Sequence, residues 1–317
     1  MAILTRYGSL WGSIPNTAGR VLWVAPTSPY LVDGRAYDRS DDNDGLSPER
    51  ALSTIQRANV LATANAGDVV VMLPGTHVLT AAVTASVAGV TYMGLPSGAG
   101  NRIRQKTVVQ ATASAACFAL TAADVEFAYL HLIPTTANSG ITMSVAADRA
   151  YIHHCSFDMF TPAASATTLG IDATGAASQI LIEQCVFHNA GAQGAAIDMT
   201  ATRDSIVQDC EFMTRSGVWA AAMTVGALTT RLRIHRCNFF AAGVTATITA
   251  GISGTGATTS GPTTITGCFF HSPANGAGAV VVPIDNFGNT CAIQVENYTA
   301  IQDITTSGTS TLIILTN

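Results

Sequence analysis

The sequence predicts an all-β fold, a parallel β-solenoid in which short strands wind into stacked coils. The first indication is a repeated motif: a small or apolar residue, any residue, an apolar residue, two residues, Cys, any residue and Phe. Copies recur at intervals of about 25 to 31 residues, a period typical of repeat architectures. The second indication is that the stretches between copies are rich in Gly, Ala, Ser and Thr, which allow neighbouring coils to approach closely.

Each copy of the motif predicts a strand, a corner and a second strand. In one copy, Ile180 and Ile182 alternate with one residue between them, as do Cys185 and Phe187. Each alternating pair predicts a short strand with one buried face. The two residues between the pairs, 183–184, break the alternation, so we expect a corner where both side chains point outward. Such a coil buries its apolar face only when other coils stack on it.

Weaker copies extend the pattern in both directions. Those upstream and downstream of the five clear copies are Val90, Tyr92 and Leu95; Val125, Phe127, Leu130 and Leu132; and Cys291, Ile293, Glu296 and Tyr298. The apolar run Ser310–Asn317 predicts a last strand, which closes the solenoid or pairs with another chain. We therefore assign residues 67–317 to the solenoid, and the segment 67–75 to its first strand and turn.

The composition excludes two broad classes of protein. The chain has 317 residues, of which 11% are charged and 48% hydrophobic, and its formal net charge is −5. A nucleic-acid-binding protein would carry a basic stripe, and a disordered protein would combine high charge with low hydrophobicity. The N-terminus shows no secretory signal pattern, and no run of about 18 apolar residues predicts a membrane span.

The seven cysteines predict buried thiols rather than disulfides. An odd number argues against a complete disulfide framework, and the absence of a Cys-x-x-Cys pair argues against structural zinc. Residues stacked in register lie about 4.8 Å apart with parallel side chains, a geometry that does not suit a disulfide. The sequence thus favours a ladder of reduced, inward thiols over metal or redox chemistry: Cys155, Cys185, Cys210, Cys237 and Cys268.

Residues 1–35 do not follow the repeat and are interpreted as an extended N-terminal arm. The segment is punctuated by Gly, Ser and Pro and contains the apolar residues Tyr7, Trp11 and Ile14. An apolar arm without a core of its own docks on another surface. That surface is either a partner protein, with these three residues as the attachment, or the chain's own solenoid. Within the arm, 21–24 predicts a strand.

Residues 36–66 predict a polar turn followed by a short capping helix. The acidic run at 40–45 lacks the complete ligand order of an EF-hand loop, so we favour a turn over a Ca²⁺ site. Ser47 before a proline predicts a short helical turn, and Ser53 predicts the cap of a helix that runs to about Ala64. Leu52, Ile55 and Leu61 would lie on one face of it.

The segments 43–58 and 66–77 together resemble the region that opens the solenoid in right-handed parallel β-helix proteins of the pectate-lyase-like kind. In those proteins a helix covers the open end of the solenoid before the first coil. The resemblance implies a single-stranded right-handed parallel β-helix from about residue 36 onward. Together with the non-repetitive arm, it implies a protein similar to the β-helix proteins of tailed-bacteriophage virions.

The best candidate for a catalytic site is an outward row formed by Glu183, Asp209, Glu211 and His235. The resemblance implies an acidic Ca²⁺ cluster with a basic residue, and β-helix hydrolases require paired carboxylates. The row mixes acidic and basic groups, and a solvated polar face explains it equally well. His153-His154 falls at a corner, where a structural role is favoured. We assign no catalytic residue, metal or cofactor.

These observations lead to two functional hypotheses. The first is a non-enzymatic virion protein, made in the host cytoplasm, that assembles as a homotrimer and decorates or stabilises the capsid. Its partners would be copies of itself and the major capsid protein or another virion protein, with neither nucleic acid nor membrane. The alternative is a tail spike or fibre that binds or cleaves host polysaccharide, which would need a groove with carboxylates and aromatic rings. Trp219, in a small-residue loop, is core filler or an interface anchor.

Overall fold

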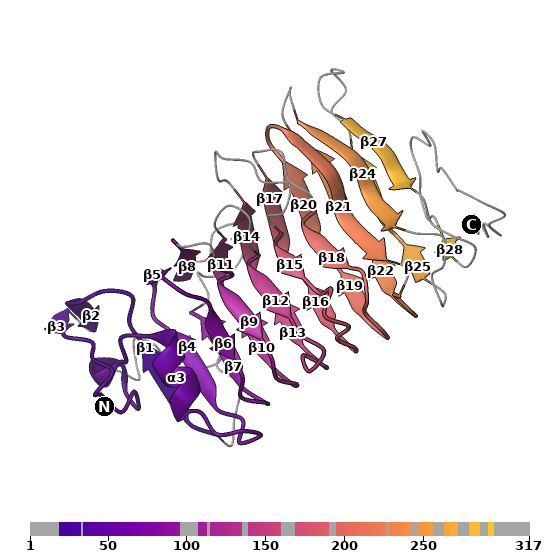
Figure 1. Ribbon diagram of the computed structural model, residues 1–317. Coiled ribbons are helices and arrows are strands. Elements are labelled where there is room, and N and C mark those ends of the chain that lie inside the picture. The colour runs from indigo at the N-terminus through magenta and orange to yellow at the C-terminus, as the bar shows by residue number, and fades with distance from the viewer. Residues whose placement is uncertain are drawn as a thin grey trace.

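A computed structural model shows a parallel β-helix (Figure 1). It describes residues 19–32, 34–95, 107–112, 115–134, 139–159, 169–189, 195–226, 228–242, 246–255, 263–271, 279–285 and 291–294. Within them the strands form three long parallel sheets and one antiparallel hairpin. The predicted all-β solenoid is therefore confirmed.

The chain visits the three sheets in turn, so a complete coil contributes one strand to each sheet. Among the described residues, β1 and β28 belong to turns that contribute a strand to the first sheet alone. The first sheet contains β1 (Val21–Val24), β4 (Val69–Met72), β7 (Thr91–Gly94), β10 (Glu126–Ala128), β13 (Tyr151–His153), β16 (Leu181–Glu183), β19 (Ile206–Gln208), β22 (Arg233–His235), β25 (Thr263–Thr266) and β28 (Cys291–Gln294). The second contains β5 (Gly75–Leu79), β8 (Thr107–Ala111), β11 (His131–Ile133), β14 (Ser156–Met159), β17 (Val186–Asn189), β20 (Glu211–Thr214), β23 (Asn238–Ala241) and β26 (Phe269–His271). The third contains β6 (Val83–Ala85), β9 (Phe118–Leu120), β12 (Ile141–Met143), β15 (Ile171–Asp172), β18 (Ile197–Met199), β21 (Val218–Gly226), β24 (Thr247–Thr255) and β27 (Ala279–Asp285).

The repeated motif spans the corner between the first and second sheets. Ile152 lies opposite Ile182 in the first sheet, and Phe157 lies opposite Phe187 in the second. The second residue of each two-residue corner has a left-handed backbone, with φ of 48° to 61° at His154, Gln184, Asp209, Arg236 and Gly267. This conformation is uncommon outside glycine. It turns the chain by one sharp step, so that Cys and Phe again face inward.

A second left-handed corner, which the sequence did not reveal, precedes each of the strands β10, β13, β16, β19 and β22 of the first sheet. It lies five residues before the first corner, at Asp124, Arg149, Gln179, Asp204 and Arg231. Each of these side chains is polar. The strands of the first sheet are therefore framed at both ends by columns of polar residues held in the same backbone conformation.

A ladder of parallel aromatic rings forms the centre of the core. Phe157, Phe187, Phe212, Phe239 and Phe270 stack in sequence, with ring centroids 4.7–5.0 Å apart and interplanar angles of 4–10°. Offset stacked rings contribute free energy beyond their buried area. At Gly170, an added Cβ would lie 2.8 Å from a ring carbon of Phe187, so the ladder also requires a residue without a side chain beside it.

The five repeat cysteines lie in the core next to this ladder. All five are free and buried, and the sulfur of Cys185 lies 3.6 Å from the carbonyl oxygen of Ile152 in the preceding coil. Burial raises the pKa of the Cys185, Cys210 and Cys237 thiols well above the usual value. These residues therefore act as small apolar side chains.

The N-terminal end of the solenoid is closed by the helix α3 (Ile55–Leu61). Its cap is Thr54, whose hydroxyl accepts the Arg57 amide, and not Ser53 as predicted; the helix also ends before Ala64. Ile55 and Ala58 are buried in the main core. In Figure 1 the helix lies against β1, β4 and β6, where it covers apolar residues that no further coil covers.

The first sheet begins earlier than residue 67, because β1 pairs in parallel with β4. The strand 21–24 was predicted, but within the arm. The acidic run forms a turn: Asp41 accepts the backbone amides of Ser53 and Thr54, and Asp44 pairs with Arg50. The 3₁₀ helix η1 (Pro48–Arg50) follows, without a side-chain cap from Ser47.

The hairpin of β2 (Tyr30–Val32) and β3 (Arg35–Tyr37) contributes to a second apolar cluster outside the solenoid. Tyr30 and Val32 pack there with outward residues of the first sheet, among them Val71 and Met93. This end of the outer face is therefore apolar and covered.

The side chain of Trp219 is fully buried in the core, so this residue fills the core and is not an interface anchor. No helix in the described ranges is long and apolar enough to cross a membrane.

We predict that Phe212→Ala lowers the free energy of unfolding by about 3–5 kcal/mol, the usual cost of removing a buried aromatic side chain. Phe212 stacks on a ring on each side, whereas among the residues that the structure describes Phe270 stacks on Phe239 alone and is only partly buried. Urea unfolding followed by circular dichroism should show a larger shift for Phe212→Ala than for Phe270→Ala. Equal shifts would contradict the ladder's role.

Candidate functional site

The four residues of the predicted outward row lie in three different places. Glu183 ends β16 and His235 ends β22, and both lie in one column on the outer face of the first sheet, with Gln208 between them. Asp209 lies at the adjoining corner. Glu211 begins β20 in the second sheet. The structure therefore does not bring these four side chains together around one reacting atom.

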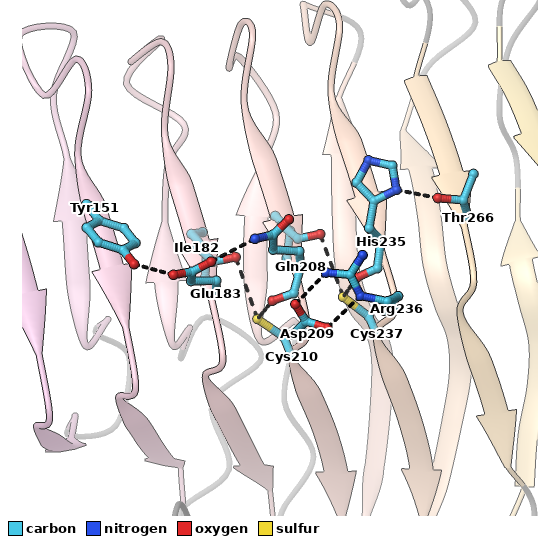
Figure 2. A network of polar contacts seen from close by, with 11 residues as sticks. Tyr151, Ile182, Glu183, Gln208, Asp209, Cys210, His235, Arg236, Cys237 and Thr266 are labelled. Carbon is cyan, nitrogen blue, oxygen red and sulfur yellow. Dashed lines mark hydrogen bonds and ion pairs between the residues drawn. The ribbon is translucent and has the colours of Figure 1, made fainter.

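Each of three residues in this row is engaged by a side chain of a neighbouring coil (Figure 2). Glu183 accepts hydrogen bonds from the Tyr151 hydroxyl and, at 2.7 Å, from the Gln208 amide. Asp209 accepts two hydrogen bonds from the Arg236 guanidinium, at 2.8 and 2.7 Å. Such bidentate pairs are strong and directional.

The imidazole of His235 hydrogen-bonds the Thr266 hydroxyl in the next coil. Its pKa is lowered, first by burial and then by the nearby guanidinium groups of Arg236 and Arg233. It is therefore neutral at neutral pH. Glu183, Asp209 and His235 therefore link adjacent coils through side-chain hydrogen bonds and ion pairs.

A cluster of aromatic, imidazole and carboxylate groups occupies the outer face further toward the N-terminus. We call it the Tyr–His–Glu cluster, and it consists of Glu126, Tyr129, Tyr151, His153 and His154. The Tyr151 ring stacks on His153 with centroids 4.2 Å apart. Tyr129 lies beside both imidazoles, 5.7 Å from His153 and 4.9 Å from His154 between ring centroids.

His153 is held from two sides within this cluster. Its Nε2 lies 2.7 Å from a Glu126 carboxylate oxygen, and its Nδ1 lies 2.8 Å from Nδ1 of His154. Thr91 donates to the other Glu126 oxygen at 2.8 Å. Burial opposes ionisation of Glu126, but the hydrogen bonds from His153 and Thr91 outweigh it and hold its pKa below the usual value. Glu126 is therefore a carboxylate at neutral pH.

The two tyrosines remain hydroxyl donors. Burial, followed by the hydrogen bond to Glu183, raises the pKa of Tyr151, and burial followed by the Glu126 charge raises the pKa of Tyr129. The cluster thus combines half-buried ring faces with polar groups. In chemical terms it suits stacking and hydrogen bonding rather than metal binding, and no group of metal ligands occurs in the described part of the chain.

The repeat contains a signal that could have identified this cluster. Glu126 and Tyr151 both occupy the position between the two inward residues of the motif, and they lie opposite each other in register. His153-His154 does lie at a corner, as predicted, and its contacts are structural in kind.

A serine, a histidine and an aspartate also meet on the second sheet. Nδ1 of His131 lies 2.6 Å from the Ser156 hydroxyl, and Nε2 lies 3.7 Å from the Asp158 carboxylate. Nucleophilic catalysis requires a serine that a substrate can reach, yet Ser156 is fully buried. We interpret this arrangement as a structural polar contact between adjacent coils. The predicted attachment residues Tyr7, Trp11 and Ile14 lie outside the described residues.

Comparison with known proteins shows similarity of fold. No protein family and no characterised protein matches the sequence. A rhamnogalacturonan lyase structure gives a TM-score of 0.49 at 9% identity, covering 94% of this chain and 87% of that one. Pectin methylesterase PemA from Erwinia chrysanthemi gives 0.45 at 12%, covering 87% and 78%. Geobacillus virus E2 ORF18 gives 0.32 at 11%, covering 76% and 53%. At these identities the similarities assign no activity.

We predict that Glu126→Ala lowers the free energy of unfolding by about 1–3 kcal/mol at pH 7, because it leaves the buried His153 without its acceptor. Asp124→Ala is the matched control on the same coil. It removes an exposed ion pair with Arg149, which water readily replaces, so its effect should be much smaller. Denaturant titration of the two variants measures the difference.

The contact between Glu126 and His153 also predicts how the stability of the protein depends on pH. A carboxyl with a lowered folded pKa contributes stability above its unfolded pKa, and that stability is lost as pH falls through the folded pKa. The gap between wild type and Glu126→Ala should therefore narrow below about pH 4.5, the ordinary value for Glu. A gap that stays constant down to pH 3 would contradict the assigned contact.

Proposed function

We propose that this chain is a structural protein of a bacteriophage virion, a β-helix that decorates and stabilises the capsid. It attaches through the N-terminal arm 1–35 and assembles as a homotrimer. The observation that carries the proposal is that polar side chains on the outer face of the first sheet are paired with one another along the stack. Such a surface favours a stiff rod over an active site.

Ion pairs between adjacent coils support the structural role. Asp124 pairs with Arg149 at 2.6 Å, and Asp209 pairs with Arg236 at 2.7 Å. Asp204 pairs in the same way with Arg231. An exposed pair contributes little free energy by itself, but each pair joins two consecutive coils and favours one stacking register. A virion protein benefits from such reinforcement because it must remain folded outside the cell.

The virion setting rests on the resemblance of segments 43–58 and 66–77, and on surfaces that another protein can cover. Small residues are frequent in the sequence between copies of the repeated motif, for example in 163–168 and 243–261. Small side chains let a neighbouring subunit approach the backbone closely. This suits lateral association of three copies and contact with capsomers.

The test is the position of the protein in purified particles. We expect immunogold labelling and cryo-electron microscopy to find it on the head, in a fixed ratio to the major capsid protein. Deleting residues 1–18 should abolish its attachment while the solenoid still folds, as checked by circular dichroism. Labelling confined to the tail tip would overturn the capsid proposal.

A second candidate function is a tail spike or fibre that acts on host polysaccharide. The Tyr–His–Glu cluster favours it, because half-buried aromatic rings beside a carboxylate are suited to bind a sugar ring and its hydroxyl groups. Tyr129 and Tyr151 would provide the ring faces, and Glu126 and Glu183 the acceptors.

This alternative makes its own prediction. Tyr151→Ala should weaken binding to purified host capsular polysaccharide at least tenfold, and Glu183→Ala or Glu211→Ala should abolish any depolymerase activity detected as released reducing ends. Val145→Ala, an exposed apolar residue elsewhere on the solenoid, serves as the control. If host polysaccharide neither binds nor shortens with the wild-type protein, the tail-spike function is wrong.

A further inference from the structure

Charge changes from coil to coil along the outer face of the first sheet. The coil of β10 carries Asp124 and Glu126, and that of β13 carries Arg149 and two histidines. The coil of β19 carries Asp204 and Asp209. The next coil, that of β22, presents three arginine side chains along one strand and its two corners, namely Arg231, Arg233 and Arg236.

Most of these basic groups have a partner in an adjacent coil. Arg231 pairs with Asp204 and Arg236 with Asp209, both in the β19 coil. Arg233 differs, because it lies between Ile206 on one side and Thr264 on the other. Its guanidinium is exposed, and no ion-pair partner for it occurs in the described ranges.

Positive charge is in excess at this place. On the far side of β22, the β25 coil offers Thr264 and Thr266 and no carboxylate. The exposed Arg203 adds a further cation, since it bridges to Thr230 just before the Arg231 corner. The pKa of Asp204 is lowered first by the Arg231 hydrogen bonds, and Arg203 and Arg233 lower it further. Four guanidinium groups thus face two carboxylates, in a chain whose net charge is −5.

We propose that this strip, formed by Arg203, Arg231, Arg233 and Arg236, binds an extended acidic segment of a partner protein, with Arg233 as its central contact. Arg233 lies on the strand β22, and Arg231 and Arg236 lie at the left-handed corners on either side of it. These cations are therefore spread along the length that an extended peptide would follow. Guanidinium groups hold carboxylates through two parallel hydrogen bonds, and Arg233 can do so without breaking an internal pair.

An acidic peptide fits this strip better than a single-stranded nucleic acid. Binding of single strands combines cations with aromatic rings on which bases stack. Beside Arg233 the neighbouring coils present Ile206 and Thr264, neither of which is aromatic. In a protein attached to a capsid, this acidic segment would belong to a neighbouring virion protein, an assignment that rests on the proposed function. Its test uses the isolated protein, so it can fail or succeed whatever the position in the particle.

The experiment measures fluorescence anisotropy of a labelled octaglutamate peptide with the full-length protein. The ionic strength is kept at about 20 mM, where screening of exposed charges is weak. We expect Arg233→Gln to weaken binding about tenfold and Arg203→Gln to weaken it by a smaller factor. Neither change removes a described ion pair, so both variants should unfold in urea at the wild-type midpoint. Binding should weaken steadily as salt is raised to 0.3 M.

Arg215→Gln is the matched control, because Arg215 is exposed and lies at the end of β20, away from the strip. Unchanged affinity in this variant, together with loss in Arg233→Gln, supports the proposal. Equal loss in both variants, or no octaglutamate binding at millimolar peptide, overturns it. Tighter binding of an oligothymidylate or of heparin than of octaglutamate also overturns it, since the preferred ligand would then be another polyanion.

Discussion

The parallel register between coils is the constraint on which the rest of the structure depends. Each strand hydrogen-bonds to the equivalent strand of the next coil, so equivalent residues stack directly above one another. In the core this brings Phe187, Phe212 and Phe239 into parallel contact at 4.7–5.0 Å. A slip by one residue would turn these rings outward. The left-handed corners, and the glycine Gly170 beside Phe187, are conditions that this one register imposes.

The same register decides what the outer face can be. Identical residues can occupy equivalent inward positions of successive coils, because aromatic rings stack on one another and buried, uncharged thiols do not repel one another. An outward column of identical charges would repel itself, and here acidic side chains of one coil instead pair with basic side chains of the next coil. Asp124 with Arg149 and Asp209 with Arg236 are the outcome. The long stack is therefore held together by apolar contacts inside and ordered by complementary charges outside.

A binding surface is best sought where outward side chains can still make contacts that the adjacent coils do not already provide. Arg233 is one such place, because its direct neighbours in register are Ile206 and Thr264, neither of which carries a carboxylate. The Tyr–His–Glu cluster is another kind of place, in which rings remain half-buried on the surface while their polar groups are already engaged. The first is open to an anionic partner, and the second offers ring faces.

The inward half of this protein could be predicted from its sequence, and the outward half could not. Apolar alternation at Ile180 and Ile182, with Cys185 and Phe187, identified the strands and the solenoid, since burial leaves a local pattern in the chain. The separation of Glu183 from Glu211, the cover provided by the hairpin 30–37 and the meeting of Glu126 with His153 were decided by the tertiary structure. An outward side chain finds its partner in another coil, about 25 to 30 residues away along the chain. The register between coils and the length of the intervening loop determine that partner, and neither can be predicted from the residues around the side chain.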